Sequence, residues 1–229
     1  MNTATALDIK MTKYTFEYGA SKYFRDNAQN VRMCSFGEKK DPIGAKAYID
    51  VQNTVDSDFV AKRVKYNTTL EIDWSKVSKA DVEAEGELKV FGLNSETAAS
   101  AGYEKVKSAK VALASFAIDE GPLKDMLNHD AGNARKYLAD EGHDGRIVSE
   151  IIVALENDLA EHVSTSASIS FAPSGSSGLK VTAKGGKYDT QTFTISTGTT
   201  FAYKLCKVKD WNRDKTQINN LETDWKGIG

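Results

Sequence analysis

Few side chains in this sequence have the types and spacing that enzymatic or metal chemistry requires. Its two cysteines, Cys34 and Cys206, stand far apart, and its histidines, His129, His143 and His162, are not spaced as metal ligands. The sequence contains no phosphate-binding loop, dinucleotide-binding glycine pattern, nucleophile elbow or zinc-protease motif. We therefore expect no enzymatic activity, no cofactor and no metal, with both thiols buried and the histidines on the surface or in loops.

The bulk composition argues against several broad classes of function. The chain of 229 residues carries 30 basic and 32 acidic side chains, and this near balance predicts no nucleic-acid partner. Residues 1–10 lack the apolar core of a secretory signal, and no run of about eighteen apolar residues predicts a transmembrane helix. Together with the wide spacing of the cysteines, these features indicate a protein of the reducing cytoplasm.

Charged and apolar side chains alternate in the stretch 64–90. The acidic positions on one face are Glu71, Asp73, Asp81, Glu83, Glu85 and Glu87. The larger apolar positions on the other face are Val64, Tyr66, Leu70, Ile72, Trp74, Val82, Leu88 and Val90. This period of two predicts two strands joined by the polar bridge 75–79. Each arm has about eleven residues, enough to cross a bilayer, whereas soluble strands usually have about five or six.

A second stretch repeats this pattern. Apolar side chains alternate with serines over residues 163–171, and the segment 173–178 supplies turn residues before a return strand. The main apolar positions on the two arms are Val163, Ile169, Phe171, Leu179 and Val181. Two interpretations fit both hairpins: strands that cross a membrane, or hairpins of an ordinary antiparallel sheet.

The remaining elements predict an α+β fold with a twisted, mainly antiparallel sheet, short helices and the two long amphipathic hairpins. Strands are expected at 31–36, 45–51, 107–118, 146–160 and within 192–208, around a tight turn at Thr197-Gly198. Helices are expected at 12–27, at 121–128 after Gly121-Pro122, and at 131–140. We divide the chain into a loose N-terminus (1–11), one domain (12–208) and a tail (209–229) that forms a short helix or a disordered end.

The closing segment, residues 192–205, resembles the last strand pair of the gasdermin pore-forming domain. It has the apolar strand Thr192-Phe193-Thr194-Ile195, a turn of small residues, and a strand containing Ala202-Tyr203-Lys204. The strand 110–118, followed by Gly121-Pro122 and a helix, and then the segment 144–155 also occur in the gasdermin order. The resemblance covers roughly residues 12–209 in the order of elements.

This resemblance implies a pore-forming protein that is cytoplasmic when inactive and acts at the plasma membrane. Such a protein binds anionic phospholipid, oligomerises and inserts two hairpins per subunit into a β-barrel, which causes lytic cell death. Little sequence follows the closing strand, as in the short fungal regulator-of-cell-death members, so no C-terminal inhibitory domain is expected. The implied partner is another copy, or an allelic or paralogous gasdermin-like protein.

The faces of the two hairpins assign roles within such a barrel. The apolar side chains named above would face lipid, and the acidic side chains of the first hairpin would line the lumen and favour cations. The basic side chains expected to contact anionic lipid are Lys13, Lys22, Arg25, Lys39, Lys40 and Lys46. The loop 37–44 carries lysines but no aromatic anchor. The alternative is a soluble, β-rich interaction or assembly module that binds partner chains by strand pairing.

Overall fold

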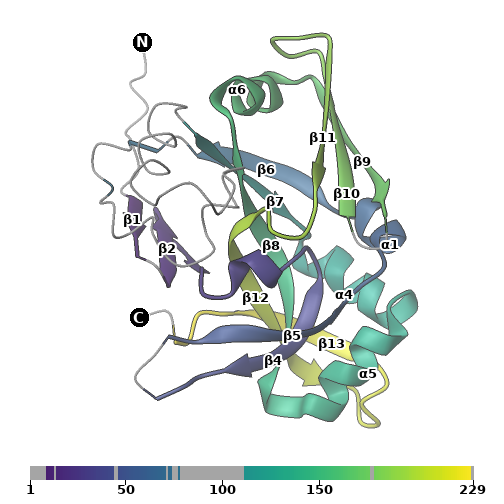
Figure 1. Cartoon of the computed structure of the whole chain (residues 1–229). Helices are drawn as coiled ribbons and strands as arrows, with labels where there is room; N and C mark the ends of the chain where they lie inside the picture. The colour runs from purple at the N-terminus through teal and green to yellow at the C-terminus, as the bar shows by residue number, and fades with distance from the viewer. Residues whose placement is uncertain are drawn as a thin grey trace.

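The structure is a computed structural model that describes residues 9–12, 14–43, 46–70, 72, 73, 77, 111–175 and 178–227. Its strands form two antiparallel sheets, one of ten strands and one of three, and short helices pack against them (Figure 1). The predicted α+β class and the mainly antiparallel sheet are therefore confirmed. Most of the first predicted hairpin lies outside the described residues.

Two long strands, β8 (Gly145–Leu155) and β12 (Thr200–Trp211), form the centre of the large sheet. They pair antiparallel, with Tyr203 opposite Ile151 and Lys204 opposite Glu150. All of β8 except Ala154 is buried, as expected for a run rich in isoleucine and valine that is covered on both faces. The predicted central strand over 146–160 is confirmed as far as Leu155, where the strand ends.

Four arms extend from this central pair. Along β8 lie β4 (Ser35–Lys40) with β5 (Tyr48–Thr54), and β7 (Ala112–Ala117) with β6 (Lys65–Leu70). Along β12 lie β3 (Ser21–Phe24) with β2 (Thr15–Tyr18) and β1 (Ile9–Met11), and separately β13 (Ile218–Asp224). The strand predicted at 45–51 is confirmed as β5, the partner of β4.

The small sheet is a meander of three strands on one side of the molecule (Figure 1). Its strands are β9 (Ser168–Ser174), β10 (Gly178–Lys184) and β11 (Thr190–Ile195), with β10 in the middle. Val181 of β10 pairs with Phe171 on one side and with Phe193 on the other. The hairpin predicted around the turn 173–178 is confirmed as β9 and β10.

Short helices connect and cover the sheets. They are η1 (Ala28–Asn30), α1 (Ser57–Ala61), α4 (Glu120–His129), α5 (Gly132–Glu141), η4 (Gly142–Asp144) and α6 (Asn157–Thr165). The predicted helices near 121–128 and 131–140 are confirmed as α4 and α5, and α5 ends at Gly142, which has a positive φ of 67°. No helix in the described part of the chain is long and apolar enough to cross a membrane.

Residues 15–24 form a hairpin rather than the helix predicted over 12–27. β2 and β3 pair directly, and Phe16 lies opposite Tyr23, both of them buried. Gly19, with φ of 57°, provides the turn between the two strands. Phe16 and Tyr18 therefore follow the period of a strand on β2, and the turn glycine was the signal that the helix prediction missed.

The second predicted hairpin begins later than expected. Val163 lies in α6, and the strand starts only at Ser168. Leu159, Ala160 and Val163 follow the spacing of a helix and face the core, with Val163 only 1 % exposed. The alternation of serine and threonine with apolar residues from 163 onward concealed this helical spacing.

Two predictions about the C-terminal part of the chain are wrong. β11 and β12 do not form a strand pair, because β11 pairs with β10 in the small sheet and β12 pairs with β8 in the large one. The turn between them is confirmed, with Gly198 at a positive φ of 86°. The tail is neither a helix nor a disordered end over residues 218–224, which form β13 beside β12.

A buried cluster of charges joins three distant strands. Asp224 on β13 accepts hydrogen bonds through Oδ2 from Nζ of Lys39 on β4, at 2.9 Å, and from Nε of Arg146 on β8, at 2.7 Å. These three side chains are between 2 % and 7 % exposed. The Lys39 ammonium group also donates to the carbonyl oxygen of Lys226, at 2.7 Å. The cluster therefore fixes the C-terminal strand to the large sheet.

The hydrogen bonds in this cluster control the ionisation of Asp224. Burial by itself would raise the pKa of Asp224, but the hydrogen bonds from Lys39 and Arg146 favour the carboxylate and lower the pKa to about 2. A carboxyl group with a lowered pKa stabilises the fold above its ordinary value of 3.8. That stabilisation, about 2 kcal/mol, is lost as the pH falls toward about 2.

Replacing this carboxylate by an amide tests the cluster. We expect Asp224→Asn to lower the free energy of unfolding at neutral pH by about 3 kcal/mol, because two buried cations lose their counter-charge. The difference from the wild type should shrink as the pH falls below about 4, since the carboxyl group of Asp224 in the unfolded wild type is then being protonated while the folded protein keeps it charged. Urea titrations at several pH values measure both effects.

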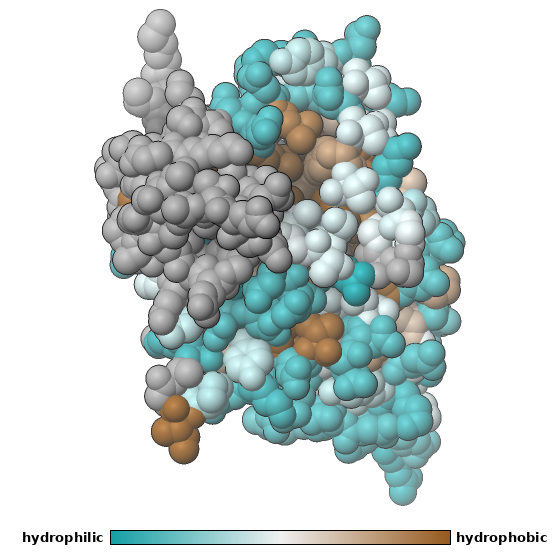
Figure 2. Space-filling view, viewed as in Figure 1, coloured by the Kyte–Doolittle hydropathy of each residue, from teal (hydrophilic) through white to brown (hydrophobic). Residues whose placement is uncertain are grey.

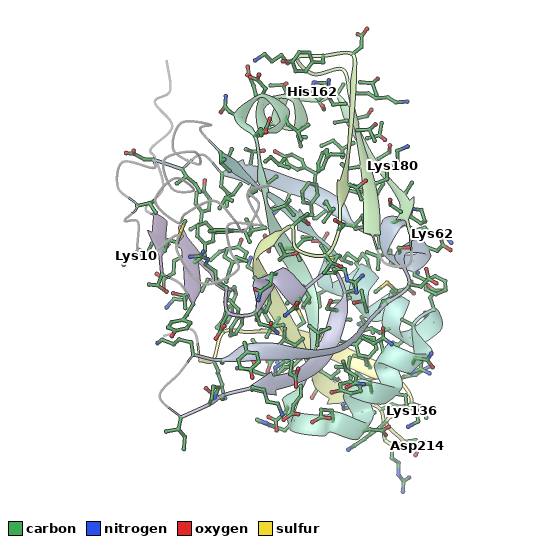
Figure 3. The ribbon with its side chains drawn as sticks, in the orientation of Figure 1. Lys10, Lys62, Lys136, His162, Lys180 and Asp214 are labelled. Carbon is green, nitrogen blue, oxygen red and sulfur yellow. The ribbon has the colours of Figure 1, made fainter. Side chains whose placement is uncertain are left out.

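The matched control is Asp214→Asn, at an exposed carboxylate in the turn between β12 and β13 (Figure 3). This change should leave the free energy of unfolding almost unaltered at every pH. Equal stability of the wild type and Asp224→Asn at neutral pH would show that the cluster does not hold β13 in place.

Candidate functional site

The small sheet has an apolar inner face. Phe171, Leu179, Val181 and Phe193 face the body of the molecule, and Val181 is fully buried. The ring centres of Phe171 and Phe193 lie 6.1 and 6.3 Å from that of Phe116 on β7. Apolar packing of this kind is not directional, so the same face could be covered equally well by another apolar surface.

The outer face of the same sheet is polar. Its side chains are Ser168, Ser170, Lys180, Thr182, Lys184, Thr190, Thr192 and Thr194. The pairing register places all of these even-numbered residues on one face, and Lys180 lies on the outside of β10 (Figure 3). Ile169, Phe171, Leu179 and Val181 share the opposite face, as their spacing in the sequence predicted.

Helix α6 holds one end of the small sheet through His162, which is fully buried. Its Nε2 lies 3.1 Å from the carbonyl oxygen of Ala183, and its Nδ1 accepts a hydrogen bond from the Tyr188 N–H at 2.9 Å. These two partners fit a neutral imidazole with its proton on Nε2. The predicted surface or loop position is therefore wrong for His162, whereas His129 and His143 are exposed as expected.

Two further residues complete this contact, which we call the α6 latch: His162, Gly186 and Lys187. A Cβ atom on Gly186 would lie 2.5 Å from the carbonyl oxygen of His162, so no larger residue fits there. Nζ of Lys187 lies 2.9 Å from Glu161 and 3.1 Å from Asp158, and hydrogen bonds to these carboxylates raise the pKa of Lys187. Because these ion pairs are exposed, the buried histidine contributes more to the latch.

The free end of the β4–β5 hairpin carries an exposed aliphatic side chain. Ile43 has an exposed fraction of 107 %, compared with 41 % for Tyr188 and 43 % for Trp225. Figure 2 shows a hydrophobic protrusion at this end of the hairpin. The sequence interpretation missed Ile43 because it looked for an aromatic anchor in this loop, although an isoleucine between Pro42 and Gly44 was an available signal.

Two of the predicted lipid-binding side chains are buried. Arg25 is 1 % exposed, and its guanidinium carbon lies 4.3 Å from the centre of the Phe201 ring. Lys39 is 8 % exposed and belongs to the cluster around Asp224. Their burial contradicts the expectation that they contact an anionic surface, because both cations are engaged inside the protein.

The remaining predicted lipid-binding residues are closer to solvent. The side chains of Lys22 and Lys40 are 45 % and 37 % exposed, and they form ion pairs with Glu17 at 3.3 Å and Glu38 at 2.5 Å. Lys46 is partly exposed, and Lys13 lies outside the described residues. Lys22 and Lys40 lie on two different hairpins, β2–β3 and β4–β5.

Only the beginning of the first predicted hairpin can be placed. Val64 is buried just before β6 rather than on a strand, Tyr66 and Leu70 belong to β6, Ile72 is partly buried and Asp73 is exposed. β6 pairs with β7 over residues 65–70. The predicted positions outside the described residues are Glu71, Trp74, Asp81, Val82, Glu83, Glu85, Glu87, Leu88 and Val90.

A second buried polar cluster surrounds Glu150 on β8, next to a cavity of about 200 Å³. The carboxylate accepts hydrogen bonds from the Tyr23 hydroxyl at 3.0 Å and the Ser115 hydroxyl at 2.5 Å, and it pairs with Nζ of Lys204 at 2.6 Å. Burial and the Glu150 charge raise the pKa of Tyr23. These contacts join β3, β7, β8 and β12 at one buried point.

A cavity of about 450 Å³ lies between the end of β5, α1 and the junction of α4 with α5. Phe36 and Phe59 form its apolar part. The carboxylates at its rim already have partners, because Asp56 accepts from the N–H of Asp58 and Asp130 pairs with Arg63. No charged group is left to define a ligand.

The two cysteines are buried and not bonded to each other, as expected. Burial raises the pKa of both the Cys34 and the Cys206 thiol, so neither is a reactive thiolate. Within the described ranges, no three histidine, cysteine, aspartate or glutamate side chains gather as they would around a metal ion.

Comparison with models of protein families, with curated proteins and with solved structures found no match to this chain. The resemblance to gasdermins therefore depends on the sequence features given above. The two-faced small sheet, the α6 latch and the exposed tip of the β4–β5 hairpin are the features from which a function can be argued.

Removing the imidazole tests the latch. We expect His162→Ala to destabilise the contact between α6 and residues 185–189 by about 2 to 4 kcal/mol, because two hydrogen bonds are lost and a cavity forms. The amide hydrogen of Tyr188, which the imidazole accepts, should exchange with solvent much faster. Hydrogen exchange followed by mass spectrometry on peptides that cover residues 178–195 measures this change.

The control is His143→Ala, which removes an exposed histidine. In this variant the peptides that cover residues 178–195 should exchange as in the wild type. If exchange around Tyr188 were as slow in His162→Ala as in the wild type, the latch would have to depend on the ion pairs of Lys187.

Proposed function

We propose that this chain is a gasdermin-like pore-forming protein that binds anionic membranes and inserts hairpins from the small sheet. The observation that carries the proposal is the two-faced three-stranded sheet, whose apolar side packs on the body and whose polar side faces outward. In a bilayer the same apolar face would contact lipid, and the serine, threonine and lysine face would contact water in a lumen. The sequence resemblance and the exposed Ile43 support the same proposal.

Insertion requires the small sheet to lengthen. β9 and β10 have seven residues each, whereas a strand that crosses a bilayer needs about nine to eleven. Arms covering 163–173 and 179–189 would have this length. The first arm requires the end of α6, from Val163, to become a strand, and the second requires the turn 185–189 to straighten.

The α6 latch lies where both of these changes must occur. His162 precedes Val163, and its partners Ala183 and Tyr188 lie at the two ends of the turn. In this proposal the latch keeps the hairpin folded until the protein is bound to a membrane.

Oligomerisation follows from the hydrogen bonding of strands in hydrocarbon. A hairpin that crosses a bilayer leaves N–H and C=O groups unpaired along both outer edges, and each unpaired group costs several kcal/mol. Neighbouring subunits must supply the missing strands, so the active form is a closed ring. The partner is another copy of this chain or, as the resemblance suggests, an allelic or paralogous gasdermin-like protein.

Membrane docking is assigned to the end of the β4–β5 hairpin. Ile43 would enter the interface between headgroups and acyl chains, while Lys40 and Lys46 lie close to it in the sequence and face the anionic headgroups. Lys22 on the β2–β3 hairpin adds a further positive charge. In this proposal the protein is cytoplasmic before activation and moves to the plasma membrane when it acts.

A specific observation favours the alternative, a β-rich interaction module without membrane activity. In the described part of the chain, β5 and β11 each pair on one side only, which leaves an edge to which a partner strand could be added. β11 also contains no proline or charged residue, the devices that usually protect an edge strand. The leakage experiment below separates the two functions.

Leakage of dye from vesicles tests the pore. We expect the protein, alone or with a paralogous partner, to release dye from vesicles containing phosphatidylserine and not from vesicles of phosphatidylcholine. Ile43→Asp should weaken vesicle binding about tenfold, because an anchoring side chain becomes a charge that anionic lipid repels. Co-sedimentation with vesicles measures the binding.

Gln217→Asp is the control, since it adds the same charge at an exposed position in the turn between β12 and β13. It should bind and leak as the wild type does. If the wild type neither binds vesicles nor releases dye under any of these conditions, the interaction module is the better account.

The polar face of β10 predicts a residue that affects ion selectivity. Lys180 would face the lumen, so Lys180→Glu should shift the reversal potential in planar bilayers toward greater cation preference. Lys136→Glu, at an exposed residue of α5, makes the same change of charge away from the small sheet and should have no effect (Figure 3). A shift of the same size in both variants would contradict the assignment of the outer face to the lumen.

A further inference from the structure

The C-terminal turn, residues 225–227, lies between the two hairpins that carry the exposed basic residues of the proposed docking surface. On one side, a Cβ atom on Gly227 would lie 2.6 Å from Cβ of Ala47 and 3.5 Å from Oδ1 of Asp41, at the base of the β4–β5 tip. On the other side, Nζ of Lys204 lies 5.6 Å from the centre of the Trp225 ring and 3.4 Å from Oγ of Ser21 on β3. Figure 1 shows the C-terminal end of the chain in this position.

Trp225 is held in an exposed position by a rigid backbone. Its side chain is 43 % exposed, and it follows Asp224, which is fixed by Lys39 and Arg146. The N–H of Lys226 donates to Oδ1 of Asp224 at 3.0 Å, so the turn is held on both sides of the tryptophan.

Two of the three large hydrophobic side chains that are exposed among the described residues, Ile43 and Trp225, belong to segments in contact with each other at this end of the molecule. The exposed lysines here are largely neutralised, since Lys22 pairs with Glu17 and Lys40 pairs with Glu38. The attraction of this surface for lipid must therefore depend on its apolar anchors more than on its charge.

We propose that Trp225 is a second membrane anchor, carried by the C-terminal turn that contacts the base of the β4–β5 hairpin on which Ile43 lies, and that its partner is the interface of a phospholipid bilayer. Tryptophan suits this environment because its ring is apolar while its N–H can still bond to water or headgroups. Lys226 follows Trp225 in the sequence and is exposed, so its ammonium group can reach phosphates. The inference rests on the proposed function, since it extends the docking surface of that same membrane-bound protein.

The fluorescence of Trp225 itself provides the test. The full chain contains three tryptophans, so Trp74→Phe together with Trp211→Phe leaves Trp225 as the sole emitter. When vesicles of phosphatidylcholine and phosphatidylserine are added, its emission should shift to shorter wavelength. Lipids brominated on the acyl chain should quench it, because the ring lies within reach of the bromine atoms.

A second variant measures how much the anchor contributes. Trp225→Ala in the same background should bind these vesicles about tenfold more weakly, which corresponds to about 1.4 kcal/mol. Gln217→Ala, an exposed change in the turn between β12 and β13, should bind as the parent does. The ratio between the affinities of the parent and of Trp225→Ala should be the same at high salt, since the contribution of an apolar anchor is not screened.

The outcomes separate this inference from the proposed function. If the parent binds vesicles but Trp225 is neither shifted nor quenched, or if Trp225→Ala binds equally well, the second anchor is disproved and the pore-forming proposal stands. If the parent binds no vesicles and causes no leakage, the proposed function fails and this inference fails with it. The quenching measurement needs no change at Trp225, so it holds even where Trp225→Ala fails to fold.

Discussion

The hydrogen bonds of Asp224 to Lys39 and Arg146 hold together parts of the chain that are far apart in sequence. They bring β4, β8 and β13 to one buried point. Each side chain there can stay charged while buried because it is paired with a group of opposite charge. Burying such charges is costly, and a hydrophobic cluster of similar volume could give equal stability. What the ionic cluster adds is position, because it fixes the C-terminal turn and the base of the β4–β5 hairpin relative to the large sheet.

The small sheet is attached in a different manner. Its apolar face packs on Phe116 and its neighbours without directional bonds, and directional contacts are concentrated at its end, where His162 and Lys187 meet. The large sheet, which is fixed by buried charges, resists rearrangement more than the small sheet, which is attached mainly by apolar contact. This difference suits a protein in which one part changes its environment while the other part keeps its shape.

Much of the fold followed from local patterns, whereas the connections between distant segments did not. Alternation correctly predicted β9 and β10, and Gly121-Pro122 correctly predicted the start of α4. The ionic partners of Lys39 lie more than a hundred residues away, so its spacing suggested a solvent-exposed lysine and no local pattern could show its burial. The strand β13 was missed for the same reason, since its polar sequence becomes a strand only through pairing with β12.

The apolar side chains of β10 and β11 keep to odd-numbered positions on both sides of the turn 185–189. The folded meander does not depend on this, because a loop can absorb one residue more or fewer without moving the strands it joins. A continuous strand has no such tolerance, since a single inserted residue would reverse the orientation of every side chain beyond it. Were residues 185–189 to become part of a continuous strand in the proposed inserted state, insertions or deletions in this turn would therefore have to come in steps of two to keep the apolar side chains on one face.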